Sequence, residues 1–309
     1  MKKKILALLL VCGLLLSLAA CGGAPAEENT ESGSAANEET TPPADTTPPD
    51  DTATPDDTQP ADEEPATLTG VSDTDSDTAY VQNKGTLVVG ITDFAPMDYK
   101  SEAGEWIGFD ADMAKAFADS LGVKADFIEI NWDNKLMELD TKAIDVVWNG
   151  MTITDEVREG ASVSDAYCLN GQVVVVPAEL ADAYTTVESL SELSFAVENG
   201  SAGAAQLDLL GIPYTALDTQ ARALMEVASG ASDACVIDLL MAGAMIGEGT
   251  SYPGLTHTLQ LNSEEYGVAF RKGSDLVDAF NQFWADASAQ GTVMETANMY
   301  GVQESVVVK

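Results

Sequence analysis

The sequence predicts an α/β fold, with a parallel or mixed sheet covered by helices, from about residue 84 to residue 309. Three features lead to this prediction. Short apolar runs with the composition of buried strands alternate with segments whose apolar residues recur at helical spacing. Such alternation is typical of sheets whose strands are joined by crossover helices. The segment is also long enough for one large domain or two lobes.

The predicted elements follow one another along the chain. The run from Thr86 to Ile91 (TLVVGI) has the composition of a buried strand. Asp110 is expected to cap a helix that carries Met113 and Phe117 on one face and ends at Gly122. Further strands are predicted over residues 127–130, 144–148, 172–176, 195–197 and 234–237, and further helices over residues 135–139, 200–210, 221–228 and 275–290.

The first twenty residues, from Met1 to Ala20, have the pattern of an export signal. Three lysines precede an apolar run from Ile5 to Leu16, and small residues follow it. The apolar run is shorter than the about 20 residues that a membrane-spanning helix needs. We therefore expect a signal peptide rather than a membrane-spanning segment.

The segment Leu18-Ala19-Ala20-Cys21 resembles the lipobox of bacterial lipoproteins. In those proteins a diacylglyceryl group is attached to the cysteine thiol and the chain is cleaved just before it, so the resemblance implies lipidation at Cys21. The alternative is an ordinary signal followed by a chance cysteine. Acyl chains contribute about 0.8 kcal/mol per buried methylene, so two or more would hold the chain durably at the outer face of the cell membrane.

Residues 21–83 are expected to form a disordered acidic tether that begins at the lipidated cysteine. Between Gly22 and Tyr80 there are sixteen Asp or Glu residues and no Lys or Arg. Such a segment buries too little apolar surface to offset the entropy of ordering it. The formal charge of the whole chain, −37, argues against a nucleic-acid partner, which would need basic patches. It favours either solubility or the long-range steering of a cationic ligand.

Two cysteines remain once Cys12 is assigned to the signal and Cys21 to the lipid. Cys168 and Cys235 belong to a compartment that permits disulfides, so a bond between them is a hypothesis. The alternative is two separate buried thiols. The sequence leaves both open because it does not give the distance between them.

Eight segments, in order, resemble the polar-amino-acid-binding family of ABC-importer receptors, which are bacterial extracellular solute-binding proteins of family 3. They span nearly all of residues 85–301. Each segment alone is a weak signal, and their order makes the resemblance specific. The segments are GTLVVGI from Gly85, GFDAD from Gly108, Ile144-Asp145, WNGMTIT from Trp148, QVVVV from Gln172, AVENGS from Ala196, SDACVID from Ser232 and EYGVAFRKG from Glu265.

This resemblance implies two α/β lobes of the periplasmic-binding-protein type II fold, joined by two crossover strands, with the ligand in the cleft between them. On that template lobe 1 comprises about residues 84–170 and 266–309, and lobe 2 about residues 171–265. It further implies a monomeric receptor that captures a polar amino acid and delivers it to an ABC permease in the membrane.

An amino acid needs a carboxylate for its ammonium group, donors for its carboxylate and a shaped pocket for its side chain. Asp238 follows a strand at the place where the resembling receptors have their ammonium-binding acid; the alternative role is a helix N-cap. Phe94 and Trp132 match aromatic residues that cover the ligand, and the alternative is core packing. Asp93 could bind a basic side chain or stabilise a turn.

Backbone and hydroxyl groups supply the other expected contacts. Asn149, Gly150 and Thr152 follow a predicted strand, and the resemblance implies that this loop presents polar groups to the ligand. Ser201 and Ala202 open a predicted helix, whose free N–H groups can hold a carboxylate. The alternative roles are a turn glycine and a helix cap.

The sequence departs from the family pattern at position 157. The family usually has an arginine directly after Thr-Asp-Glu, which binds the ligand carboxylate through a two-pronged salt bridge. This chain has Val157 there, followed by Arg158. Either a local shift lets Arg158 serve, or backbone donors hold the carboxylate, or the ligand is not a standard α-amino acid.

Two other classes of function compete with this interpretation. A sensory lipoprotein would use the same cleft without an importer. An enzyme, such as a dehydratase on a related fold, is disfavoured because His257 is the single histidine and no paired metal-ligand motif is present. We therefore expect no catalytic residue, no metal and no cofactor.

Overall fold

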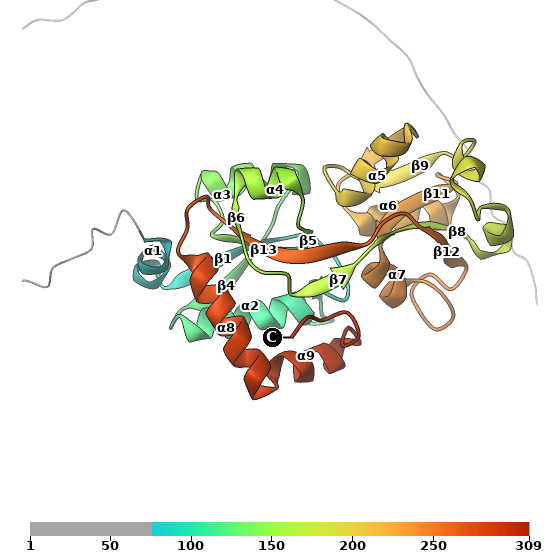
Figure 1. Cartoon of the computed structure of the whole chain (residues 1–309). Helices are drawn as coiled ribbons and strands as arrows, with labels where there is room; N and C mark the ends of the chain where they lie inside the picture. The colour runs from blue at the N-terminus through green and yellow to red at the C-terminus, as the bar shows by residue number, and fades with distance from the viewer. Residues whose placement is uncertain (1–75, 309) are drawn as a thin grey trace, which may run out of the picture. The chain divides into compact units, whose positions relative to one another are not determined.

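The computed structural model describes residues 76–308, which contain two mixed sheets covered by helices (Figure 1). This arrangement confirms the α/β class. The expected export signal, Cys21 and most of the expected tether lie outside the described residues. Within residues 76–308, no helix has both the length and the apolar character needed to cross a bilayer.

The first sheet has the strand order β4-β1-β5-β13-β6, and β7 also pairs with β13. Strand β1 runs parallel to both of its neighbours, whereas β13 runs antiparallel to β5. The central strands are buried on both faces, which explains their nearly continuous apolar sequences. The strands are β1 (Thr86–Ile91), β4 (Lys124–Glu129), β5 (Val146–Thr152), β6 (Ser162–Val163), β7 (Cys168–Asn170) and β13 (Glu264–Phe270).

The second sheet has the strand order β10-β9-β11-β8-β12. Strands β9, β10 and β11 are parallel to one another, and β8 runs antiparallel to β11 and β12. Along β8, Val174 and Val176 pack in one apolar cluster and Val173 and Val175 in another, as successive side chains point to opposite faces. The strands are β8 (Gln172–Pro177), β9 (Phe195–Glu198), β10 (Tyr214–Leu217), β11 (Ala234–Asp238) and β12 (Leu255–Gln260).

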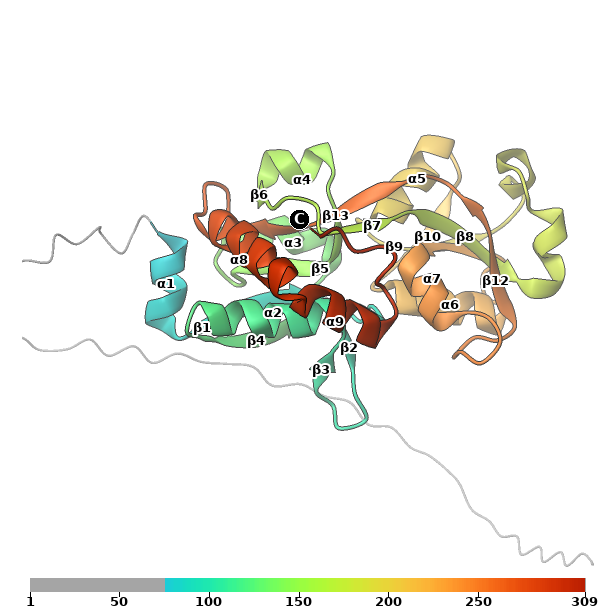
Figure 2. The same cartoon turned by 60° about the horizontal axis from the view of Figure 1, so that its bottom comes forward.

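The helices cover the faces of both sheets. Helices α2, α8 and α9 contact one another beside the first sheet, and a short hairpin of β2 (Tyr99–Lys100) and β3 (Trp106–Ile107) lies next to α2 (Figure 2). Helices α5, α6 and α7 pack on the second sheet. The main helices are α1 (Asp77–Lys84), α2 (Phe109–Ser120), α3 (Lys135–Asp140), α4 (Asp155–Gly160), α5 (Ala202–Leu210), α6 (Gln220–Ser229), α7 (Leu239–Met245), α8 (Leu276–Gln290) and α9 (Thr292–Tyr300).

The chain passes between the two sheets twice, from β7 to β8 and from β12 to β13. The two passages touch at Gly171, where an added Cβ would lie 2.6 Å from the backbone oxygen of Asn262. The side-chain oxygen of Asn262 also accepts a hydrogen bond from the amide of Gln172 at 2.7 Å. Hereafter lobe 1 means the elements of the first sheet with α1–α4, α8 and α9, and lobe 2 means β8–β12 with α5–α7.

The folded part begins before residue 84. Ser76 caps α1 by accepting a hydrogen bond from the amide of Ala79, and Val81 is fully buried. Asp77, counted in the acidic tether, forms an ion pair with Arg271 at 3.0 Å. The acidic composition predicted a disordered tether here, but residues 77–84 form helix α1, and Asp77 of this helix pairs with the buried Arg271.

Asp110 does not cap the helix that was expected to begin there. The N-cap of α2 is Gly108, and the Asp110 carboxylate accepts hydrogen bonds from the amide of Gly150 and the hydroxyl of Tyr167, both at 2.7 Å. Tertiary partners thus replace the local helix amides as donors. Helices α1, α4, α7 and α9 were also not predicted.

Cys168 and Cys235 are both free and buried, and no disulfide joins them. Cys168 lies in β7 of the first sheet and Cys235 in β11 of the second. The structure therefore has the second of the two arrangements left open by the sequence. Burial raises the pKa of both thiols, which keeps them protonated and unreactive.

Candidate functional site

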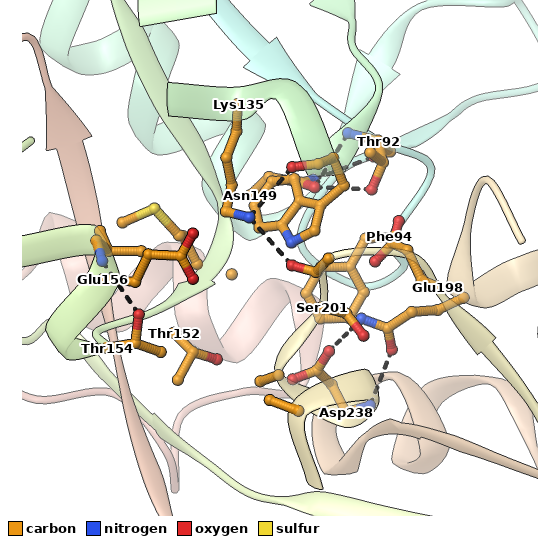
Figure 3. A pocket seen from close by; sticks show the side chains of 18 of the residues that line it. Thr92, Phe94, Lys135, Asn149, Thr152, Thr154, Glu156, Glu198, Ser201 and Asp238 are labelled. Carbon is orange, nitrogen blue, oxygen red and sulfur yellow. Dashed lines mark hydrogen bonds between the residues drawn. The ribbon is translucent and has the colours of Figure 1, made fainter. Parts of the chain in front are cut away.

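A cavity of about 280 Å³ is lined by residues from both lobes (Figure 3). Its volume is close to the lower end of the range for small-molecule sites, about 300–1,000 Å³, so it suits a ligand of the size of a single amino acid. Eight of the ten predicted ligand-binding residues line it: Phe94, Trp132, Asn149, Gly150, Thr152, Ser201, Ala202 and Asp238.

Asp238, the last residue of β11, enters the cavity from lobe 2 and is only 4% exposed. Its Oδ1 accepts hydrogen bonds from Gln172 at 2.8 Å and from the hydroxyl of Tyr266 at 2.7 Å, and also from the side-chain amide of Asn170. Gln220 donates to its Oδ2. Burial, followed by the nearby Glu264, raises the pKa of Asp238 to about 7. A cation bound beside Asp238 would therefore stabilise the charged form of this carboxylate.

Glu198 is a second buried acid in the cavity wall. It ends β9, beside β11, and is 2% exposed. Its Oε1 is buried and has no hydrogen-bond partner. Burial, followed by the charge of Asp238, raises the pKa of Glu198 to about 8. The protein itself thus does little to stabilise the charged form of this carboxylate.

Lys135, in the first turn of α3, reaches the cavity from lobe 1. Its ammonium donates to the backbone oxygens of Trp132 in lobe 1 and Gly200 in lobe 2, both at 3.1 Å, so it links the two lobes (Figure 3). Desolvation lowers its pKa, and the neighbouring acids Glu156 and Glu198 oppose that shift. An ammonium has three donors, and these two bonds leave one for a ligand.

Phe94 and Trp132 cover the cavity from lobe 1 and are 2% and 7% exposed. Both also belong to apolar clusters, so each ring packs in the core with one part and lines the cavity with another. The Lys135 ammonium lies 5.0 Å from the centre of the Trp132 ring. The rings exclude water from the polar groups of the cavity.

The backbone at Gly150 requires glycine. Its φ is +54°, and an added Cβ would lie 2.2 Å from Cε1 of Phe94. The neighbouring Asn149 is occupied by the protein, because it accepts from both the amide and hydroxyl of Thr92 and donates to Asp98 at 2.8 Å. We conclude that Asn149 fixes the shape of this wall with its side chain.

The side chains of Thr152 and Ser201, two further predicted contacts, already form hydrogen bonds within the protein. The hydroxyl of Thr152, at the end of β5, donates to Glu264 at the start of the neighbouring strand β13, at 3.0 Å. Ser201 caps α5 by accepting from the amide of Ala204 at 3.1 Å. The first turn of α5 lines the cavity through Ala202 and Ala205. Amides in the first turn of a helix lack partners within the helix and can hold an anion.

Asp93 and Arg158 do not line this cavity. Asp93 is exposed although its neighbour Phe94 is buried, since successive residues point in opposite directions there. Arg158 is exposed on α4 and lines a separate hollow with Gln206 and Asn262. Val157, at the position where the family has arginine, is 3% exposed in an apolar cluster.

Seven polar residues that line the cavity were not predicted. Four of them are Thr92, Thr154, Asp155 and Glu156, and the other three are buried or partly buried: Lys135, Glu198 and Gln220. Glu198 carried a usable signal, because it ends a strand and ligands bind at the carboxyl ends of parallel strands. The other two lie on helices, and their direction depends on how α3 and α6 pack. Among residues 76–308, no group of three or more potential ligands could hold a metal ion.

Comparison with known proteins agrees with this geometry. The family model for bacterial extracellular solute-binding proteins, family 3, matches residues 87–303. The L-cystine-binding protein TcyJ of Escherichia coli is 29% identical over 217 residues, which cover 69% of this chain and 81% of that protein. The arginine-binding extracellular protein ArtP of Bacillus subtilis is 27% identical, over 67% of this chain and 82% of that protein.

A solved structure gives the same result. The crystal structure of a variant of ArgBP from T. maritima superposes with a TM-score of 0.68 and 31% identity, covering 73% of this chain and 99% of that chain. The match includes both lobes, since the family model extends from β1 to beyond α9. This chain belongs to family 3 of the bacterial extracellular solute-binding proteins.

Proposed function

We propose that this protein is the receptor of an ABC importer and that it binds a single amino acid in the cavity between its lobes. The observation that carries the proposal is the distribution of charge around the cavity. Two buried acids, Asp238 and Glu198, enter from lobe 2, and Lys135, the one cation among the lining residues, enters from lobe 1. Lobe 1 also contributes two acids, Asp155 and Glu156, which are exposed and not buried. A zwitterion complements both sides. Relatives whose names state cystine or arginine binding support the same class of ligand.

Lys135 and the first turn of α5 bind the ligand carboxylate in this proposal. Lys135 already approaches α5 through its bond to Gly200, which directly precedes the helix cap. A helix N-terminus and an ammonium both favour an anion placed between them. This arrangement supplies the charge that the family's arginine would otherwise supply at position 157.

Replacing Lys135 with Met is expected to weaken ligand binding by about tenfold or more, because a hydrogen bond to a charged group contributes about 1.5–3 kcal/mol. Titration calorimetry with the best amino-acid ligand measures the change. Arg158→Ala is the matched control, because it also removes a cation from lobe 1, but one that does not line the cavity. Equal losses in the two variants, or a loss only in Arg158→Ala, would contradict this assignment.

A thermal-shift screen with all standard amino acids, several small peptides and sugars tests the proposed function. A ligand at about one hundred times its dissociation constant adds about 2.7 kcal/mol to stability, which raises the midpoint of unfolding by several degrees. We expect one or a few amino acids to do so. If no amino acid shifts the midpoint while a solute of another class does, the ligand class is wrong.

The export signal and the lipid at Cys21 complete the proposal. They place the receptor on the outer face of the cell membrane, where it presents captured ligand to a permease. Binding favours the conformation for which the ligand has the higher affinity. The ligand is bound without chemical change, and mass spectrometry of recovered ligand checks this. Incorporation of a lipid precursor that is lost in Cys21→Ser tests the anchor.

A further inference from the structure

The cavity holds more buried acidic groups than a simple zwitterion requires. Glu198 and Asp238 end adjacent parallel strands, β9 and β11, and the carboxyl ends of parallel strands open at the same edge of a sheet. Neighbouring strands are about 4.8 Å apart, so the two carboxylates can reach different groups of one small molecule. Lys135 is the one cation among the residues that line the cavity.

The two acids differ in how the protein satisfies them. Asp238 accepts four hydrogen bonds from neutral donors, on Asn170, Gln172, Gln220 and Tyr266. Glu198 is equally buried, yet its Oε1 has no partner. A buried polar atom without a partner costs about 1–3 kcal/mol, and more when it is charged. Gln220 forms a side-chain hydrogen bond with Glu198, so the oxygen of this acid that lacks a donor is Oε1.

Lys135 does not supply that donor. Its ammonium is directed to two backbone oxygens, one in each lobe, rather than to a carboxylate. A neutral zwitterion would place its carboxylate by Lys135 and its ammonium by Asp238, and the Oε1 of Glu198 would remain buried without a partner. A second positive group on the ligand would give the Oε1 of Glu198 the donor that it lacks.

We propose that Glu198 binds the side-chain cation of the ligand, so that the receptor takes amino acids with a positively charged side chain. This inference rests on the proposed function and adds the charge class of the ligand and the residue that reads it. The α-ammonium pairs with Asp238, the carboxylate with Lys135 and α5, and the side-chain cation with the unpartnered oxygen of Glu198.

Titration calorimetry with matched pairs of ligands tests the inference. L-Arginine is compared with L-citrulline, a neutral analogue of nearly the same shape, and L-lysine with L-norleucine. The wild-type protein is expected to favour the cationic member of at least one pair by about tenfold or more, since a buried charge-assisted bond contributes about 1.5–3 kcal/mol.

Glu198→Gln keeps the shape of the side chain and removes its charge. We expect this variant to lose most of its affinity for the cationic ligand and to keep its affinity for the neutral analogue within about threefold, which is under 1 kcal/mol. Binding should also release fewer protons than in the wild type, as read from the dependence of the binding enthalpy on the buffer. Glu192→Gln, which removes an exposed acid of lobe 2, is the control and should change neither quantity.

The outcomes separate the two proposals. If the wild-type protein binds neutral amino acids as tightly as their cationic analogues, or Glu198→Gln keeps the full preference, the role of Glu198 is wrong and the receptor function stands. If no amino acid binds at all, the receptor proposal itself fails. The comparison within the wild-type protein decides the question even if the variant does not fold.

Discussion

Replacing Asp238 with Asn is expected to weaken amino-acid binding by about a hundredfold or more, the largest effect of any single substitution in the cavity. Removing one partner of a buried charge pair costs about 2–5 kcal/mol. The variant should still fold, because Asn retains an oxygen for Gln172 and Tyr266, which donate to Oδ1 in the wild type. Titration calorimetry measures the affinity, and circular dichroism checks the fold.

Asp218→Asn is the control for this experiment. It removes the same charge from an exposed residue of lobe 2 whose side chain is 74% exposed and pairs with Arg222. Exposed ion pairs contribute about 0–1 kcal/mol, and this one lies outside the cavity. If Asp238→Asn bound the ligand as well as Asp218→Asn does, the ammonium would have to bind elsewhere.

The ligand-free protein is expected to become less stable as the pH rises from about 5 to about 8. Burial raises the pKa of Asp110 and Asp238 to about 7 and of Glu198 to about 8. In the unfolded chain such groups have a pKa of about 4, so the folded protein binds more protons within this window. Their contribution is fully present below the unfolded pKa and is lost as the pH rises through the folded pKa, by up to about 1.4 kcal/mol per pH unit for each group.

Urea unfolding at several pH values measures this dependence, and Asp98→Asn tests its origin. Asp98 is fully buried, its Oδ1 has no partner, and burial followed by Asp110 raises its pKa. The substitution should flatten the loss of stability at alkaline pH, because it removes one of two buried acids that repel each other. A stability that increases steadily from about pH 5 to about pH 8 would contradict the assigned directions.

Ligand binding should show the opposite dependence on pH. A cationic group pairs with the charged forms of Asp238 and Glu198, so binding a ligand drives protons off these acids. Affinity is therefore expected to increase with pH up to about 8 and then to level off, since both groups are then ionised without the ligand. The two trends share one cause, which is the burial of acids that the protein does not neutralise.

Much of the fold followed from local patterns. The strand at Thr86–Ile91 begins and ends where the sequence predicted, because a fully buried strand needs a continuous apolar run. The helix at α8 was likewise evident from its apolar spacing. Helix α1 was not predicted, because the ion pair between Asp77 and Arg271 joins residues almost two hundred positions apart in the sequence.

The sequence by itself determined the α/β class, the order of strands and helices, the family resemblance and eight of the residues that line the cavity, including Asp238. The fold class and the order of elements follow from short-range rules, chiefly apolar periodicity, whereas the cavity residues follow from the family resemblance. Tertiary structure alone decided that Lys135 enters the cavity and that Arg158 does not. The physical reason is that the direction of a side chain depends on how its element packs, and that burial, not residue type, raises the pKa of Glu198 and leaves its Oε1 without a donor.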